Sequence, residues 1–267
     1  MVLSYNLYKM LNSVTIDAEE YQKRQPFPYA FQDSILHEMA ATLLQKEILA
    51  ISQDAWDRYS NPFEDKWTLR DKHTFPPVLS LLFKELESER FVSQLSRICG
   101  YPLIVDPTRN FWGVHTYNNG DKLDIHVDAG LHPTTNQKKQ LTLGIYLSAN
   151  WKEEYGCELE IWRGENAASD SPKLFEKVIS IAPLYNRMVL FTCNDYAWHG
   201  NPVPVQGPED AKRIFITISY LSENDSDQNK KTKAFFIARP GDPIDEEKDK
   251  LRLLRADPAR YKEVYRV

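Results

Sequence analysis

The spacing of apolar residues predicts a helical N-terminal region. From Asp33 to about Tyr59, and again from Pro77 to Arg97, apolar side chains recur every three or four positions, as on one face of a helix. Gly100 is a typical end signal for the second helix. The polar stretch between them, Ser60 to Thr74, is predicted to be a loop. We expect both helices to pack against a sheet.

After Gly100 the pattern changes to short runs rich in β-branched and aromatic residues, separated by turn residues. The runs predict strands at 110–117, 122–128, 140–147, 157–163, 174–181, 187–193 and 212–221. Short strands without intervening helices are typical of a sandwich or a double-sheet jelly roll. The predicted fold class is therefore mainly β with flanking helices (α+β): a double-stranded β-helix (jelly roll) core supported by N-terminal helices.

Beyond Leu221 the sequence predicts an appended segment. A polar stretch, 222–233, is predicted to be an exposed loop, Ala234–Ala238 a short strand, and Asp245–Arg255 a helix, with a second helix beginning at Asp257. No linker rich in Gly, Ser or Pro divides the chain. We therefore expect one domain with three parts: 1–100 as a helical support region, 101–222 as the jelly-roll core and 223–267 as a C-terminal extension.

Charge and cysteine content narrow the class of protein. The net charge of −5 and the pI near 5.8 disfavour a general polyanion-binding surface, so no nucleic-acid partner is expected. No apolar run approaches membrane-spanning length, and the N-terminus lacks the pattern of a signal peptide. The three cysteines are far apart and odd in number, which indicates buried free thiols rather than a disulfide framework. These features predict a soluble cytoplasmic protein without a membrane partner.

Candidate chemistry first emerges in the strand at 122–128. Residues alternate between the two faces of a strand, so an aliphatic face opposes one that carries Asp124, His126 and Asp128. An imidazole and a carboxylate two residues apart on one face can bind a divalent metal together with a second histidine. Such a triad leaves coordination positions open for a cosubstrate and O2. The His-X-Asp triplet alone is a weak signal, so other residues must support it.

Two further strands have one aliphatic face and one face with functional groups, as the wall of a binding cavity requires. The functional faces carry Thr142, Gly144 and Tyr146 in one strand, and Arg213, Phe215, Thr217 and Ser219 in the other. A buried guanidinium needs an anion. From the pattern alone, the anion for Arg213 is either a protein carboxylate, such as Asp124 or Glu160, or the carboxylate of a ligand.

Four sequence blocks resemble, in order, the prolyl-hydroxylase branch of the iron(II)/2-oxoglutarate oxygenases. They are YNNGDKLDIHVD, LTLGIYLSANWKEEYGCELEIW, APLYNRMVLFTCNDYAWHG and RIFITISY, within residues 110–221. The resemblance implies that His126, Asp128 and His199 are the iron ligands. One departure is Gly156-Cys157 where the family usually has two glycines, which a thiol tolerates only if no positive φ is required there.

The same resemblance assigns residues to the cosubstrate. It implies that Arg213 and Tyr146 hold the far carboxylate of 2-oxoglutarate. Thr217 matches a position that faces the cosubstrate, and Tyr117 is expected over the cosubstrate or the substrate. The implied cofactors are Fe(II), 2-oxoglutarate and O2, with ascorbate as a reductant.

The implied activity is that of a dioxygenase that hydroxylates an unactivated C–H bond and releases succinate and CO2. Because Asp128 fills a ligand position that related halogenases leave without a side chain, hydroxylation is favoured. The leading substrate is a prolyl residue of a polypeptide, with the tail 233–267 expected to help bind it. The alternatives are a hydroxylase of a free amino acid or other small metabolite, and a non-catalytic metal-binding jelly-roll module. Phe235–Ile237 in the tail alternatively pack on the barrel.

Overall fold

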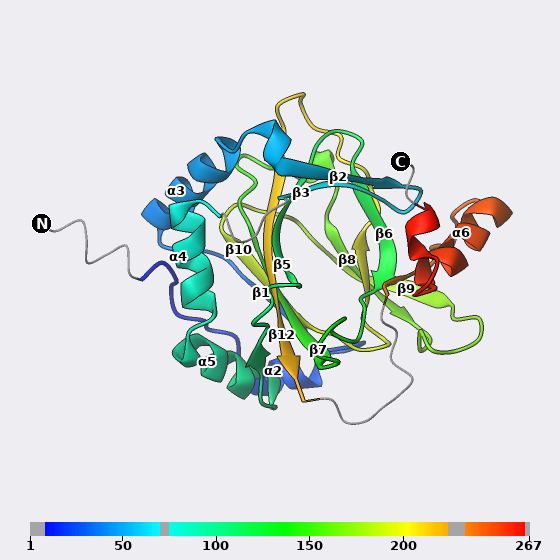
Figure 1. Cartoon of the computed structure of the whole chain (residues 1–267), viewed down its shortest axis with the longest axis horizontal. Helices are drawn as coiled ribbons and strands as arrows, with labels where there is room; N and C mark the ends of the chain where they lie inside the picture. Colours follow the sequence, from blue (N-terminus) through cyan, green and yellow to red (C-terminus); the bar gives the residue numbers. More distant parts are fainter. Residues whose placement is uncertain (1–8, 70–74, 224–232, 265–267) are drawn as a thin grey trace, which may run out of the picture.

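The computed structural model describes residues 9–69, 75–223 and 233–264, shown in Figure 1. Its strands are β1 (Tyr29–Gln32), β2 (Trp56–Asn61), β3 (Glu64–Leu69), β4 (Ile104–Val105), β5 (Trp112–Tyr117), β6 (Lys122–Val127), β7 (Lys138–Tyr146), β8 (Leu159–Gly164), β9 (Leu174–Ile181), β10 (Arg187–Thr192), β11 (Trp198–Asn201), β12 (Arg213–Ser222) and β13 (Phe235–Phe236). All neighbouring strands pair antiparallel, in the order β1-β10-β7-β12-β5-β3-β6-β11-β8-β9. In addition, β13 pairs with β6, β2 with β3 and β4 with β12.

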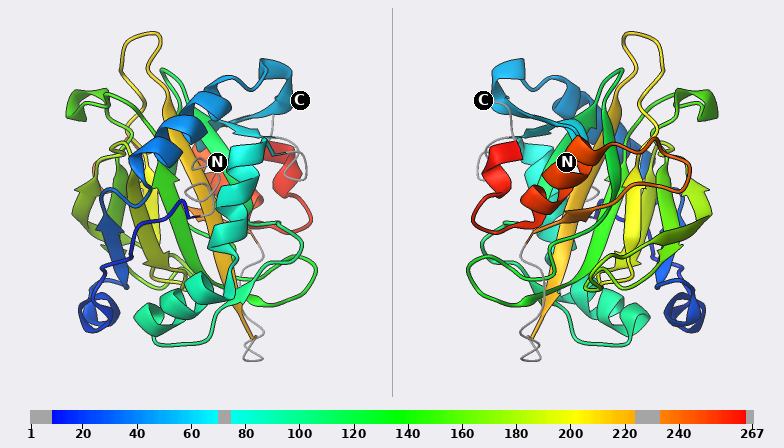
Figure 2. Two further views of the ribbon diagram at one scale, coloured as in Figure 1. Left: turned by 90° about the vertical axis from the view of Figure 1, so that its left-hand side faces the viewer. Right: turned by 90° about the vertical axis from the view of Figure 1, so that its right-hand side faces the viewer.

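The helices are α2 (Ala18–Lys23), α3 (Glu38–Leu49), α4 (Pro77–Leu86), α5 (Glu89–Cys99) and α6 (Glu246–Ala256). Short 3-10 turns lie at Gln53–Ala55, Glu153–Tyr155 and Tyr261–Val264. Figure 2 shows the blue and cyan N-terminal helices on one side of the sheet and the orange α6 on the opposite side. The N-terminal helices and the C-terminal segment therefore contact different walls of the β structure.

The main core lies between the N-terminal helices and the wall formed by β7 and β12. The predicted aliphatic faces of these strands, including Leu143, Ile145, Ile216 and Ile218, are buried in one cluster with α3, α4 and α5. Each such side chain stabilises the fold by about 1.5–3 kcal/mol when it is removed from water. This packing fixes which face of β7 and β12 points away from the helices, toward the interior of the barrel.

The fold class predicted from the sequence is confirmed. The sheet curls so that β1, β10, β7, β12 and β5 form one wall and β6, β11, β8 and β9 form the other, with β3 joining them, as in a jelly roll. All seven strands predicted between residues 110 and 221 are present. The short strand predicted at Ala234–Ala238 is β13, and the helix predicted at Asp245–Arg255 is α6.

Two predictions for the N-terminal region were wrong. The polar stretch expected to be a loop contains β3, which forms a hairpin with β2 and joins β5 to β6; its last residues, 70–74, lie outside the described part of the chain. The helix expected from Asp33 to Tyr59 covers only α3, because β2 takes up its final residues. Alternate residues of β3 face a polar cavity, so the strand lacks the hydrophobic alternation by which strands are usually predicted.

Smaller differences have local causes. The helix predicted from Pro77 to Arg97 is two helices, since Ser88 ends α4 and caps α5 by accepting a hydrogen bond from the backbone N–H of Phe91. The helix expected from Asp257 is a turn followed by a 3-10 segment. Most of the loop predicted at 222–233 lies outside the described residues. The three cysteines are buried free thiols, as expected. In the described ranges no helix is long and apolar enough to cross a bilayer.

Candidate metal centre and cosubstrate pocket

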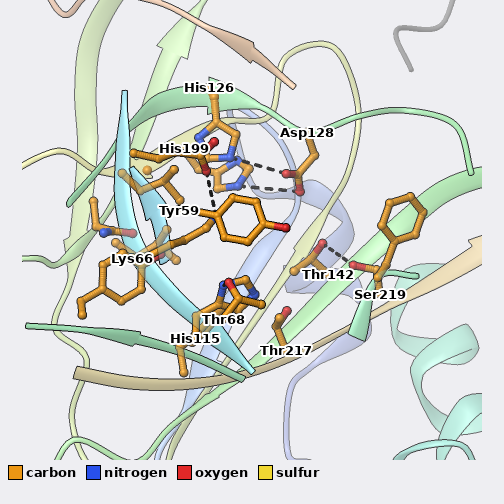
Figure 3. A pocket seen from close by; sticks show the side chains of 18 of the residues that line it. Tyr59, Lys66, Thr68, His115, His126, Asp128, Thr142, His199, Thr217 and Ser219 are labelled. Atoms are coloured by element: carbon orange, nitrogen blue, oxygen red, sulfur yellow. Dashed lines mark hydrogen bonds and ion pairs between the residues drawn. The ribbon is translucent and has the colours of Figure 1, made fainter. Parts of the chain in front are cut away.

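His126, Asp128 and His199 come together at the junction of β6 and β11 (Figure 3). The two strands pair antiparallel with His199 directly opposite His126, and the imidazole centroids are 4.5 Å apart. Asp128, just after β6, places Oδ1 3.5 Å from His126 Nε2 and Oδ2 3.9 Å from His199 Nε2. One ligand atom of each residue lies within 4.8 Å of the other two. Two nitrogens and a carboxylate oxygen at this spacing suit one divalent transition metal.

Hydrogen bonds orient both imidazoles toward this point. His126 Nδ1 lies 2.9 Å from the backbone carbonyl oxygen of Asp124, and His199 Nδ1 lies 2.8 Å from that of Ala197. A carbonyl can only accept, so each Nδ1 carries the proton and each Nε2 keeps its lone pair. Burial and the neighbouring His126 lower the pKa of His199 to about 4. At neutral pH, the imidazole of His199 is therefore uncharged, which is the form that can bind a metal ion.

Lys139, which the sequence did not single out, supports the carboxylate. Lys139 is the second residue of β7, and its Nζ donates a hydrogen bond of 2.6 Å to Asp128 Oδ2. Burial alone would raise the pKa of Asp128, but the Lys139 ammonium and the two imidazoles outweigh it and hold that pKa well below its usual range. Asp128 is therefore ionised, and its orientation is fixed by a buried partner.

Gly200, the residue after His199, permits the close pairing of β11 with β6. A Cβ at this position would lie 2.7 Å from the carbonyl oxygen of Asp124 and 2.8 Å from that of Leu123. Both atoms belong to the backbone of β6 and cannot move aside without shifting the strand. A side chain here would separate the two strands that carry the histidines.

We predict that Gly200→Ala weakens both the fold and the metal site. Overpacking of this kind typically costs about 1–3 kcal/mol, which corresponds to a melting temperature lower by roughly 2–10 °C for a domain of this size. Mn(II), measured by electron paramagnetic resonance titration, should bind more weakly, because His199 is displaced from His126. Unchanged melting and unchanged Mn(II) affinity would show that β11 can shift at no cost.

The triad opens into a cavity of about 400 Å³ that Arg213 also lines. Arg213 is the first residue of β12 and is 2% exposed. Its Nη2 donates a hydrogen bond of 3.3 Å to the Tyr146 hydroxyl, while Nε and Nη1 have no hydrogen-bond partner among the described residues. A buried guanidinium with two unsatisfied nitrogens is costly unless an anion binds there.

The protein carboxylates that the sequence offered as partners for Arg213 are engaged elsewhere. Asp124 accepts from Lys122 and Lys248, each at 2.7 Å. Glu160 accepts from the Trp162 indole at 2.8 Å and pairs with Lys177 at 3.3 Å. Neither of these carboxylates pairs with Arg213 in the described part of the chain.

The other predicted cosubstrate residues line the same cavity. Tyr146 in β7 and Tyr117 in β5 are buried, with their ring centroids 4.9 and 4.6 Å from the Arg213 guanidinium carbon. Burial raises the pKa of Tyr146 to about 12, so its hydroxyl stays protonated and can donate. Thr217 also lines the cavity, although its hydroxyl donates to the carbonyl of Leu143 at 3.2 Å.

Comparison with known families agrees with this arrangement. The sequence profile of the 2OG-Fe(II) oxygenase superfamily matches residues 112–220, the stretch that contains the triad and Arg213. The match identifies this part of the chain as the core of a 2OG-Fe(II) oxygenase. Its metal and cosubstrate are accordingly Fe(II) and 2-oxoglutarate, and the residues that surround the triad and Arg213 suit both groups. A search of curated protein sequences returned no match to this oxygenase.

Several solved structures share the fold of this oxygenase. A prolyl hydroxylase from Trichoplax adhaerens, in complex with a hypoxia-inducible factor peptide fragment, has 16% identity and a TM-score of 0.55 over 82% of this chain and 92% of that one. A Pseudomonas putida prolyl-4-hydroxylase has 12% identity and a TM-score of 0.53 over 78% and 99%. An alpha-ketoglutarate-dependent carbocyclase from nogalamycin biosynthesis has 13% identity and a TM-score of 0.57, over 88% of this chain and 91% of that chain. These likenesses show a common fold.

Two further features of the oxygenase were not predicted from its sequence. Phe236 of β13 is 2% exposed and stacks on His126 at 5.0 Å between ring centroids, so the C-terminal segment forms part of the metal site's outer wall. Cys157 has a φ of +52°, which is a left-handed conformation. From the sequence, a cysteine was expected to replace the second glycine only where no positive φ is required, so this expectation was wrong. The buried Sγ of Cys157 accepts a hydrogen bond of 3.1 Å from Asn201, which helps hold this conformation.

Proposed function

We propose that this oxygenase is a hydroxylase in which His126, Asp128 and His199 hold Fe(II), and Arg213 with Tyr146 holds the distal carboxylate of 2-oxoglutarate. The observation that carries the proposal is the buried Arg213 guanidinium, with two unsatisfied nitrogens, in the same cavity as the triad. A dicarboxylate bound to the metal at one end would supply the missing acceptors at its other end. A non-catalytic jelly-roll module has no need of such a pair of sites.

The chain's own residues would orient the reactants and keep the site dry. Arg213 offers Nε and Nη1, and Tyr146 offers its protonated hydroxyl, to one carboxylate. Thr217 and Tyr117 would flank the carbon chain of the cosubstrate. When bound, iron would activate O2 as the oxidant, with 2-oxoglutarate as the co-oxidised partner that is released as succinate and CO2. The carboxylate of Asp128 occupies a ligand position, which favours hydroxylation as the outcome.

We propose a prolyl residue of a polypeptide as the substrate, with a free amino acid or small metabolite as the alternative. The fold is shared with a prolyl hydroxylase in complex with a peptide fragment, and also with a carbocyclase of nogalamycin biosynthesis. Both substrate classes are thus compatible with the scaffold, since function resides in the site rather than the fold. The β2–β3 hairpin lines the cavity with Tyr59, Glu64, Lys66 and Thr68, outside the jelly-roll strands that carry the triad, and is the candidate for discriminating between them.

Contacts within the chain engage many of the tail residues that were expected to bind the substrate. Phe236 is buried against Phe63 and His126, and Phe235 packs beside Trp198, which agrees with the alternative that this run packs on the barrel. The tail arginines pair with carboxylates of the chain itself, at Asp242, Asp249, Glu64 and Glu263. Of these four arginines, Arg255 lines the cavity.

The test is substrate-stimulated succinate release with Fe(II), 2-oxoglutarate and ascorbate. Prolyl peptides should raise succinate formation above the uncoupled rate and gain one oxygen atom, as measured by mass spectrometry. Free proline and other free amino acids should leave the uncoupled rate unchanged. Stimulation by free amino acids alone would replace the polypeptide assignment with the metabolite one. An absence of any 2-oxoglutarate turnover would contradict the proposed activity itself.

A further inference from the structure

Phe215 of β12 lines the cavity beside the two residues that would hold the distal carboxylate of 2-oxoglutarate. It lies two residues after Arg213 and therefore on the same face of the strand. Its ring centroid is 5.5 Å from the guanidinium carbon of Arg213 and 4.8 Å from the ring centroid of Tyr146. The ring is partly buried, so one part of it packs on the wall and another part faces the cavity.

The ring of Phe215 occupies a place that only a glycine leaves open. Gly144 is its diagonal neighbour on β7, because Gly144 pairs with Thr217 and the next inward residue, Tyr146, pairs with Phe215. A Cβ added at Gly144 would lie 2.0 Å from both Cε2 and Cζ of Phe215. The missing side chain at Gly144 therefore allows the ring tip to lie against β7 instead of projecting further into the cavity.

The two ends of the cosubstrate would be held by rigid parts of the barrel. Arg213 is 2% exposed and lies in a strand that pairs on both sides, with β5 and with β7. The triad belongs to the opposite wall, where β6 and β11 pair with each other. Densely packed interiors do not expand to fit an extra methylene. A 2-oxo acid with a longer chain therefore has to bend sideways to keep both of its ends in place.

We propose that Phe215, accommodated by Gly144, sets the chain length of the 2-oxo dicarboxylate that the cavity accepts. This inference rests on the proposed function and adds to it a residue that determines cosubstrate specificity. The ring lies beside the carboxylate site, so it packs on the methylene groups of a five-carbon acid and fills the space into which a six-carbon acid would bend. In an apolar pocket, one additional methylene is typically discriminated by about 10–200-fold.

The cavity contains a matched control for Phe215. Phe111 is also a partly buried phenylalanine that lines the cavity. It lies toward the other end, since its carbonyl accepts a hydrogen bond from the backbone N–H of Ser219, and its ring centroid is 5.1 Å from Lys139 Nζ. Ser219 is six residues beyond Arg213 in β12, which corresponds to roughly 20 Å along a strand. Phe111→Ala therefore removes the same ring from the same cavity without opening space beside Arg213.

The experiment measures the affinity of the full-length protein, loaded with Mn(II), for 2-oxoglutarate and for 2-oxoadipate, which has one more methylene. Isothermal titration calorimetry provides both dissociation constants, and circular dichroism checks the fold of each variant. The wild type should bind 2-oxoglutarate at least about tenfold more tightly than 2-oxoadipate. Phe215→Ala should reduce this ratio by about tenfold or more, through tighter binding of 2-oxoadipate. Phe111→Ala should leave the ratio unchanged.

Gly144→Ala tests the same pair of residues from the other strand. The added methyl group should displace the ring into the cavity and remove most of the affinity for 2-oxoglutarate. Mn(II) binding, measured by electron paramagnetic resonance titration, should be retained, because the triad lies on the opposite wall. The double variant Gly144→Ala, Phe215→Ala should regain affinity for 2-oxoglutarate, since the displaced ring is then absent. General destabilisation at Gly144 would not be rescued by this second substitution.

An unchanged ratio in Phe215→Ala, an equal change in Phe111→Ala, or no rescue in the double variant would overturn the inference. If Phe215→Ala does not fold, Phe215→Leu, which keeps an apolar side chain but shortens it, should shift the ratio in the same direction. If the wild type shows no Mn(II)-dependent binding of 2-oxoglutarate, the proposed function fails, and the inference fails with it. If it binds 2-oxoglutarate but the ratio does not respond to Phe215, only the inference fails.

Discussion

Replacing His199 with alanine is expected to abolish 2-oxoglutarate turnover and weaken Mn(II) binding by more than about 100-fold, since contacts outside the ligand set alone are worth 10–100-fold. The imidazole is the proposed ligand from β11, and no other described histidine lies within reach of His126 and Asp128. His199 is also the cleanest ligand to remove. It is uncharged at neutral pH, whereas removing Asp128 would leave Lys139 buried without its partner.

The fold should survive this change. The ring packs on Phe191 at 4.4 Å, and its loss should cost about 1–3 kcal/mol, or roughly 2–10 °C in melting temperature. Activity is measured as succinate release and metal binding by Mn(II) titration, with circular dichroism as the check on folding. His37→Ala, at an exposed position before α3, is the matched control and should behave like the wild type. Normal turnover by the His199→Ala protein would remove His199 from the metal site.

Replacing Arg213 with methionine is expected to have opposite effects on the free and the liganded protein. Without ligands, the variant loses a buried charge that has no carboxylate partner among the described residues, so its melting temperature should equal or exceed that of the wild type. With Mn(II) and 2-oxoglutarate, the wild type should gain about 2.7 kcal/mol at a ligand concentration 100 times Kd, or roughly 5–10 °C. The variant should lose most of that gain, because the distal carboxylate loses its guanidinium.

This pair of measurements separates a cosubstrate role from a structural one. An arginine held by a protein partner would destabilise the free protein when removed and leave the ligand-induced shift intact. Arg213→Lys keeps the charge but loses the planar fork, so an intermediate shift is expected. Differential scanning fluorimetry with and without 2-oxoglutarate provides each value. A lower melting temperature for ligand-free Arg213→Met, with an unchanged shift, would show that Arg213 is structural.

The sequence alone indicated the core of the fold and most of the candidate site. Strand alternation is a local property, and it predicted that Leu143 and Ile216 face the helices while Thr142 and Arg213 face the interior. The same alternation placed His126 and Asp128 on one face. The order of the motifs then added His199, although four residues in β11 give too short a pattern to be predicted as a strand.

The tertiary structure decided what depends on contacts between distant parts of the chain. Whether Arg213 had a protein partner could not follow from its own strand, because the answer depended on which cations reach Asp124 and Glu160. Polarity made β3 resemble a loop, since one face of this strand lines a polar cavity. Sequence periodicity indicates which way a side chain points. It does not show that Lys66 and Arg255, about 190 residues apart in the chain, both reach the carboxylate of Glu64 once the sheet has closed.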